Sequence, residues 1–242
     1  MKNNYYYELV TGNPIRYKNL YIYQVSFDDI CTIFGDDNFN YLMMPFCLTA
    51  EYIKETTGVD IQDGNIFKEI ILKDKNLLEN VCQILLLFCK CEKITLFDQT
   101  LQLYDKENND VMFKITNENF NDISDILLMI NGKEKLKIEK PPEGLSERQL
   151  DIWMKIHEGR KREAKKNHLQ TYDIINICEF GGKSHIPVDE IKKWSFWKLI
   201  NCYKSIAGDR EYEDNLRIGI ESHDLSSIEK DKHWLKKLMI RD

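Results

Sequence analysis

The sequence predicts an α+β protein that is mostly helical, with a small antiparallel hairpin or sheet and a helical C-terminal region. Alternating strand-like patterns occur only near the N-terminus and over residues 94–115. Most other apolar residues recur at helical spacing. The chain has 242 residues, of which 43% are hydrophobic, so it is long enough for one large domain or two small ones with a real core.

The first predicted elements are a strand and a capped helix. Residues 15–25 are rich in β-branched and aromatic side chains, which favours a strand. Ser26 can accept a hydrogen bond from the first turn of a helix over residues 27–34. Gly35 is expected to end this helix because glycine adopts the backbone conformations that follow a helix end.

A helical stretch follows, with one ambiguous segment. Residues 38–57 predict a helix that Pro45 kinks or splits and that Gly58 stops. Residues 61–72 contain a turn signal and fit either a strand or the start of a helix. Residues 77–89 are apolar on nearly all sides, which predicts a central buried helix.

The most apolar run, residues 81–89, lies inside this central helix. A bilayer-spanning helix needs about 20 apolar residues, so the run is too short to cross a membrane. We expect Leu85, Leu86 and Phe88 to lie in the core. The N-terminus lacks the apolar stretch of a secretory signal, and the seven cysteines are expected to be free thiols in a reducing cytosol.

Residues 94–104 and 111–115 are the predicted strands of a hairpin, with a turn rich in Asn and Asp between them. Thr116 or Asn117 is expected to cap the next helix. That helix has a single apolar face, made of Phe120, Ile123, Ile126, Leu127 and Ile130. Asn131 and Gly132 are expected to end it.

A charged, proline-containing segment over residues 133–144 is the best boundary in the chain. We therefore expect an N-terminal α+β domain over residues 1–132, a linker over residues 133–145 and a helical C-terminal domain over residues 146–242. The C-terminal domain should open with a capping box made by Ser146 and Gln149.

The helix after this cap changes character along its length. Leu150, Trp153 and Met154 share one side, and the helix becomes hydrophilic beyond Ile156. The basic run that follows can contact phosphate or an acidic partner, although such a run is more often a solvated helix end. Its basic members are Lys155, Arg160, Lys161, Arg162, Lys165 and Lys166.

A cluster of helical patterns follows. One helix is expected to end at Gly181–Gly182, another to begin at Pro187, and a third to run from Ser195 to Gly208. The third would bury Phe196, Leu199, Ile200, Tyr203 and Ile206. Core packing is the better interpretation of Trp194, Phe196 and Trp197, and a groove for a partner is the second.

No catalytic, cofactor or metal site is predicted. The GGKS sequence at residues 181–184 lacks the first glycine and the preceding strand of a phosphate-binding loop, so it is better explained as a helix end with an exposed Lys183. The five histidines have no metal-binding spacing, and Cys89 with Cys91 lacks a second pair of ligands. No acidic pair stands out as an acid–base site. The net charge of −6 argues against a protein that coats nucleic acid.

Five sequence segments together resemble a group of proteins from the tail-morphogenesis module of tailed phages that infect low-GC Gram-positive bacteria, namely tail-assembly chaperones. These segments are KNLYIYQV, ITNENFNDISDILL, ERQLDIWMKIHEGRK, YDIINICEFGGKSHIPVDEIKKWSFWKLINCYKSI and HWLKKL. The resemblance covers most of residues 94–238 and consists of helix-starting and apolar patterns. The resemblance does not extend to residues 43–91.

The resemblance implies a non-enzymatic protein of the host bacterial cytoplasm that binds tape-measure or tail-tube subunits during assembly. Alternatives are a structural tail or baseplate component and a small regulatory nucleic-acid-binding protein. Apolar and aromatic anchors with a neighbouring basic run suit a helical partner that has an acidic segment. The candidate partner-binding residues are Trp153, Arg160, Lys161, Arg162, Trp194 and Trp197.

Overall fold

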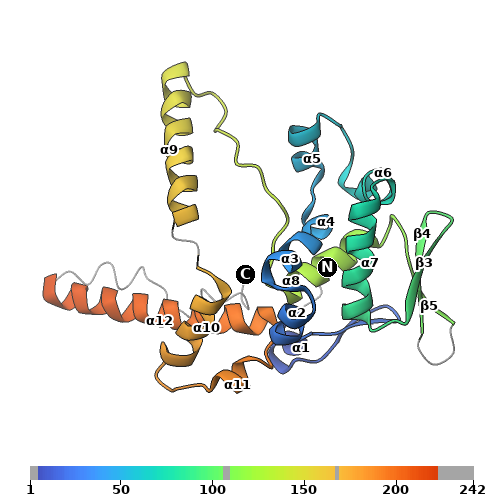
Figure 1. Cartoon of the computed structure of the whole chain (residues 1–242). Coiled ribbons are helices and arrows are strands. Elements are labelled where there is room, and N and C mark those ends of the chain that lie inside the picture. Colours follow the sequence, from blue (N-terminus) through green and yellow to red (C-terminus); the bar gives the residue numbers. More distant parts are fainter. Residues whose placement is uncertain (1–4, 106–109, 167–168, 223–242) are drawn as a thin grey trace.

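The computed structural model describes residues 5–105, 110–166 and 169–222. Helices dominate, and the strands form a two-stranded and a three-stranded antiparallel sheet (Figure 1). The predicted fold class, α+β with mostly helices, is therefore confirmed. None of the helices in the described ranges is both long enough and apolar enough to span a membrane.

The helices fall into two groups on either side of residues 133–145. Those before this segment are α1 (Tyr6–Thr11), α2 (Phe27–Phe34), α3 (Asp36–Leu42), α4 (Met44–Cys47), α5 (Ala50–Thr57), α6 (Ile66–Glu69), α7 (Lys75–Cys89) and α8 (Phe120–Ile130). Those after it are α9 (Glu147–Lys166), α10 (Thr171–Phe180), α11 (Val188–Ile191) and α12 (Phe196–Ser222). Two 3₁₀ turns, η1 (Asp63–Asn65) and η2 (Ile71–Lys73), flank α6.

The N-terminal strand pattern folds back on itself. It forms a hairpin of β1 (Ile15–Tyr17) and β2 (Leu20–Ile22), so the single strand expected over residues 15–25 is wrong. The chain reverses at Lys18, whose φ of 54° is left-handed. The sequence pattern does not reveal this turn, because both strands of the hairpin have side chains that alternate with a period of two residues.

The second sheet also contains one strand more than the sequence indicated. Its order is β3 (Lys93–Phe97), β4 (Thr100–Tyr104) and β5 (Val111–Ile115). The strand expected over residues 94–104 is split by a tight turn at Asp98 and Gln99, both with positive φ, as two-residue hairpin turns require. The expected turn before β5 lies mainly outside the described residues.

Most of the predicted helix ends are confirmed. The Ser26 Oγ accepts a 3.1 Å hydrogen bond from the Asp29 N–H at the start of α2, and Gly35 follows its last residue. The helix expected over residues 38–57 is split into α3, α4 and α5, with Pro45 near the start of α4, and Gly58 ends α5 in a left-handed conformation. The ambiguous segment 61–72 is helical, as η1, α6 and η2.

Helix α7 is central, as predicted. Its Asp74 cap accepts hydrogen bonds from two backbone N–H groups, and Leu85 and Phe88 are completely buried. The prediction that Leu86 lies in the core is wrong, because its side chain is 37% exposed. An apolar residue on the solvent face of a helix cannot be distinguished from its buried neighbours by composition alone.

Helix α8 buries the predicted face, since the five residues of that face are at most 4% exposed. The expected cap at Thr116 or Asn117 is wrong, because α8 begins at Phe120. The Asn119 Oδ1 instead accepts a 2.9 Å hydrogen bond from the Thr116 N–H, which closes a turn ahead of the helix. Asn131 and Gly132 end α8 as expected.

The buried apolar side chains form one core cluster. Phe120 of α8 stacks on Phe67, with ring centroids 4.9 Å apart, and on Phe46 at 5.7 Å. The start of α12 enters the same cluster, where Phe196 and Trp197 are buried. The segment after the linker therefore does not have to bury these rings by itself, because the N-terminal helices cover them.

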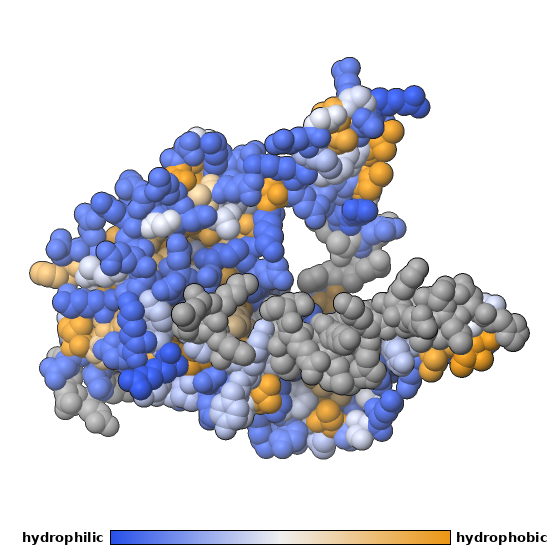
Figure 2. Space-filling view, turned by 180° about the vertical axis from the view of Figure 1, so that it is seen from behind, coloured by the Kyte–Doolittle hydropathy of each residue, from blue (hydrophilic) through white to orange (hydrophobic). Residues whose placement is uncertain are grey.

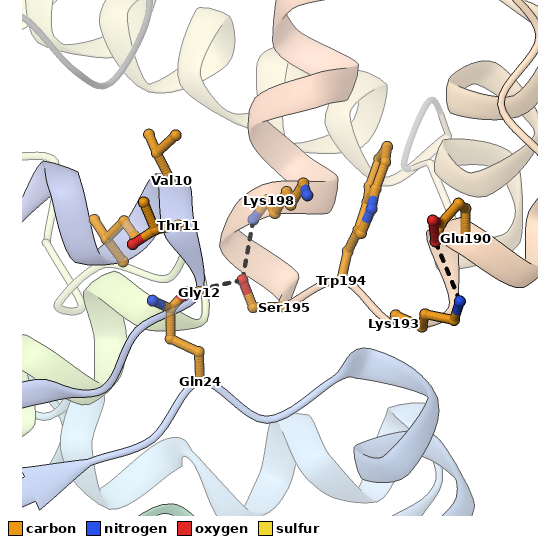
Figure 3. Close-up of a pocket in the computed structure, with 10 residues that line it drawn as sticks. Val10, Thr11, Gly12, Gln24, Glu190, Lys193, Trp194, Ser195 and Lys198 are labelled. Carbon is orange, nitrogen blue, oxygen red and sulfur yellow. Dashed lines mark hydrogen bonds and ion pairs between the residues drawn. The ribbon is translucent and has the colours of Figure 1, made fainter.

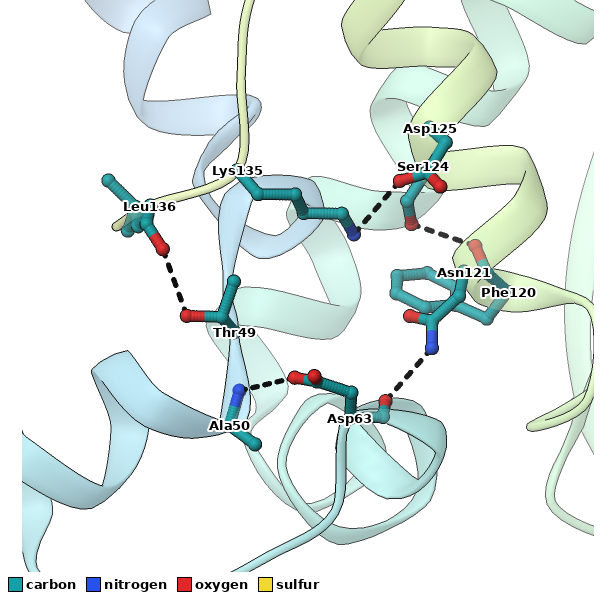
Figure 4. A network of polar contacts seen from close by, with 9 residues as sticks. All are labelled: Thr49, Ala50, Asp63, Phe120, Asn121, Ser124, Asp125, Lys135 and Leu136. Carbon is teal, nitrogen blue, oxygen red and sulfur yellow. Dashed lines mark hydrogen bonds and ion pairs between the residues drawn. The ribbon is translucent and has the colours of Figure 1, made fainter. Parts of the chain in front are cut away.

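Part of the predicted linker is held against the N-terminal helices (Figure 4). The N–H of Leu136 donates to the Cys47 carbonyl at 2.7 Å, and the Thr49 hydroxyl donates to the Leu136 carbonyl at 2.9 Å. Lys135 also lies 3.6 Å from Asp125 of α8. The described residues 133–145 contain no helix or strand, yet their first half has a defined path.

Helix α12 continues well beyond its predicted end. We expected Gly208 to stop it, but the helix runs to Ser222. Glycine in a helix interior costs only about 1 kcal/mol, which the helix-forming residues beyond it can offset. Lys183 of the α10–α11 loop lies 3.1 Å from both Asp209 and Glu213, and Arg210 donates to the Gly181 carbonyl, so side-chain contacts support the continuation.

Candidate interaction surface

Helix α9 projects away from the packed part of the molecule (Figure 1). Its first turn is stabilised by Gln149, whose Oε1 accepts hydrogen bonds from the Ser146 N–H at 2.9 Å and the Ser146 hydroxyl at 2.8 Å. This is the Gln half of the predicted capping box. The helix is 20 residues long and runs to Lys166.

The apolar side chains of α9 face solvent. Of the α9 side chains that the structure describes, none is buried. The most exposed apolar ones, between 37% and 51% accessible, are Leu150, Ile152, Met154 and Ile156. Apolar surface is visible along the projecting lobe at the upper right of Figure 2. A helix with this composition would ordinarily bury such residues.

Trp153 is only partly exposed, and its ring lies against its own helix. Its ring stacks on His157 one turn later, with centroids 4.8 Å apart and an interplanar angle of 10°. The Nδ1 of His157 lies 2.6 Å from a carboxylate oxygen of Glu139 in the linker. These contacts connect the linker to the middle of α9 and fix the Trp153 ring on the helix surface.

The basic residues follow directly after the apolar half of α9. Arg160, Lys161 and Arg162 are all exposed, and successive residues on a helix point in directions about 100° apart, so the three charges are spread over about half of the helix circumference. Their position near the helix C-terminus also suits the negative end of the helix dipole. The side chains of Lys165 and Lys166, and all of His168, lie outside the described part.

The two other candidate tryptophans lie elsewhere. Trp194 is partly exposed just before α12, and the Lys198 ammonium lies 5.0 Å from its ring centroid. Trp197 is 2% exposed and belongs to this chain's own core, so its assignment as a partner-binding residue is not supported by its position. The structure thus groups Trp153 with the basic residues on α9 and leaves Trp194 and Trp197 apart.

Trp194 borders the cleft drawn in Figure 3. The cleft measures about 440 Å³ and lies between the end of α1 and the segment from α11 to α12. The Ser195 hydroxyl donates to the Gln24 side-chain oxygen at 3.2 Å and accepts from the Lys198 N–H at 3.3 Å. Lys193 pairs with Glu190 at 3.3 Å. Ser195 therefore serves as a helix cap, and Glu190, the carboxylate among the lining residues, is paired with Lys193.

The titratable groups elsewhere do not converge on a metal site. Within the described ranges, no three His, Cys, Asp or Glu side chains are grouped so that they could hold a metal ion. Cys89 is buried in the core, and burial raises the pKa of its thiol, which disfavours the thiolate that a metal would need. The predicted absence of metal and cofactor stays a prediction.

Two features of the exposed surface lie outside the sequence-based predictions. Ile152 and Ile156 lie four residues apart, so they share a second side of α9, and this spacing was visible in the sequence. Leu216, Ile218 and Ile220 are exposed on the distal half of α12. Leu216 and Ile220 are likewise four residues apart and share one side of α12, whereas Ile218 lies on the opposite side.

No family model, curated protein or solved structure matches this chain.

Proposed function

We propose that the chain is a non-enzymatic assembly protein that binds a helical partner through α9. In the class indicated by the sequence resemblance, it would be a tail-assembly chaperone acting in the cytoplasm of an infected bacterium. Its partner would be a tape-measure or tail-tube subunit. The observation that carries the proposal is the projecting helix α9, whose apolar side chains remain exposed.

The energetics of an unsupported helix favour a partner. Helices in proteins obtain most of their stability from packing an apolar face, and α9 has no buried side chain among those described. Covering apolar surface is favourable by about 25 cal/mol per Å². A partner that lies along Ile152 and Ile156, which share one side of α9, would therefore both gain affinity and stabilise the helix.

The charges next to this apolar surface indicate the partner's chemistry. Arg160, Lys161 and Arg162 begin one turn after Ile156. Earlier in α9, Lys155 and Asp151 form an ion pair at 2.8 Å. An amphipathic helix with an acidic stretch beyond its apolar face would match both parts. The exposed basic triplet also supports the alternative of a nucleic-acid-binding protein. Capture of tail proteins and binding of duplex DNA distinguish this alternative from an assembly protein.

The test is co-expression of the full chain with tape-measure and tail-tube proteins of the source genome, followed by affinity capture. We expect at least one of them to be retained. The variant Ile156→Glu should lose that partner, because it places a charge on the apolar surface of α9. Ile33→Glu is the matched control, since Ile33 of α2 is similarly exposed but lies outside α9.

Two results would contradict the proposal. If no tail protein is retained while duplex DNA is bound with a steep dependence on salt, the regulatory nucleic-acid-binding alternative replaces it. If the partner is retained equally by Ile156→Glu and by Ile33→Glu, α9 is not the binding surface. Finding the chain in purified particles would instead indicate a structural tail or baseplate component.

A further inference from the structure

Two thiols from different helices meet where α10 packs on α12. Cys178 of α10 is completely buried, and its Sγ lies 3.6 Å from the Leu199 carbonyl oxygen on α12. Cys178 is also hydrogen-bonded to Cys202 of α12. Residues three apart on a helix lie on the same side, so the contacts to Leu199 and to Cys202 place Cys178 against one turn of α12.

The other cysteines are arranged differently. No disulfide links any of the seven cysteines, which all lie in the described ranges, and Cys31, Cys47 and Cys82 are half-buried on other helices. Cys89 and Cys91 are close in sequence, but both are buried in the core. The Cys178–Cys202 pair is distinct because it joins two helices and because Cys202 retains partial access to solvent.

The two thiols have unequal acidity. The hydrogen bond that Cys178 donates lowers the pKa of Cys202, and the nearby positive charge of Lys198 lowers it further. The same hydrogen bond and burial raise the pKa of Cys178. The thiolate is the nucleophile in disulfide exchange, so the more accessible Cys202 is the attacking group and the buried Cys178 is the second group.

We propose that Cys178 and Cys202 form a redox-active dithiol that converts reversibly to a disulfide by exchange with a small-molecule disulfide such as oxidised glutathione. The Cys202 thiolate attacks one sulfur of glutathione disulfide, whose S–S bond breaks, and one glutathione thiolate leaves. The Cys178 sulfur then attacks the Cys202 sulfur of the mixed disulfide and releases the second glutathione. The two protons of the protein thiols end on the two glutathione thiols, so two protein thiols are oxidised and one disulfide is reduced.

This site is separate from α9 and does not depend on the proposed function. Its disulfide would tie α10, which follows α9 in the chain, to the half of α12 that is anchored in the core. The exposed residues of α9 take no part in the chemistry.

The test uses the reduced full-length protein, incubated across a series of reduced-to-oxidised glutathione ratios. Samples are quenched with acid, the remaining thiols are alkylated, and peptides are mapped by mass spectrometry. We expect loss of two of the seven thiols and a crosslinked peptide pair that contains Cys178 and Cys202. Reduced glutathione in excess should restore both thiols.

Single variants define the roles of the two sulfurs. Cys178→Ser should accumulate glutathione on Cys202, because the second attack is missing. Cys202→Ser should leave Cys178 unmodified, because Cys178 is buried. Cys31→Ser is the control and should keep the crosslink. The proposal is overturned if the wild-type protein retains both thiols at the most oxidising ratio, or if Cys202 in the wild-type protein remains a mixed disulfide without a crosslink to Cys178.

Discussion

The rings of Phe39 and Phe196 stack nearly parallel, with centroids 5.5 Å apart and planes 5° apart. Phe39 belongs to α3 and Phe196 begins α12, so this contact joins the N-terminal helices to the last helix of the described chain. Two hydrogen bonds lie beside it, since the Phe27 N–H donates to the Trp194 carbonyl at 2.8 Å and Ser195 donates to Gln24 at 3.2 Å. The base of α12 is therefore part of the central core.

This relationship predicts a large effect of Phe196→Ala on stability. Removing a buried phenylalanine ring from a packed core costs about 3–5 kcal/mol. Chemical denaturation should show a loss of this size, whereas Ile218→Ala, on the exposed distal half of α12, should change stability by less than about 0.5 kcal/mol. Equal effects of the two variants would show that α12 is not anchored through Phe196.

Adjacent leucines of α7 provide a second test of the core. Leu85 is completely buried and Leu86 is 37% exposed. Leu85→Ala should destabilise the fold by about 2–5 kcal/mol, because it leaves a cavity beside Phe88 and its neighbours. Leu86→Ala should cost much less in the same denaturation experiment. An unchanged melting temperature for Leu85→Ala would contradict the central position of α7.

The third prediction concerns alkaline stability. The Tyr17 hydroxyl donates a 2.7 Å hydrogen bond to Asp122, and burial together with this carboxylate raises the pKa of Tyr17 from 10.0 to about 12. The unfolded state loses the tyrosine proton first, so the stabilisation is complete below pH 10 and is lost as the pH rises to about 12. Thermal melts at pH 8 and near pH 11 should show a smaller decrease for Tyr17→Phe than for the wild-type protein. Equal decreases in melting temperature for the two proteins would contradict a raised pKa of Tyr17 as the cause.

The fourth prediction concerns the proposed partner of α9. Replacing Arg160, Lys161 and Arg162 with Glu should slow association and weaken its salt dependence, because opposite charges accelerate encounter more than they add affinity. Binding kinetics measured by surface plasmon resonance with the captured partner, at several salt concentrations, would give the association rate constant and its salt dependence. The control makes the same charge change away from α9, at Lys68, Lys75 and Lys192, which are exposed. Equal slowing in the control would indicate a general charge effect.

The residue types close to each element were sufficient to predict many of the helices and their ends. Ser26, Gly35 and Gly58 mark helix ends because the capping hydrogen bond and the backbone conformation depend on one or two residues. The buried face of α8 followed from apolar spacing. The composition and basic run of α9 were also visible, although only the structure shows that the helix projects with its apolar residues uncovered.

The sequence by itself determined the positions of most helices and extended segments, with residues 61–72 left open, and the apolar face of α8, because these properties depend on residues a few positions apart. Only the tertiary structure decided that Trp197 is buried while Trp194 is partly exposed, that Leu86 faces solvent, and that α12 continues past Gly208. Each of these outcomes depends on contacts between distant segments, such as Phe39 with Phe196 or Lys183 with Asp209. Spacing along the chain cannot report such contacts, because burial is a property of the neighbours that folding brings together.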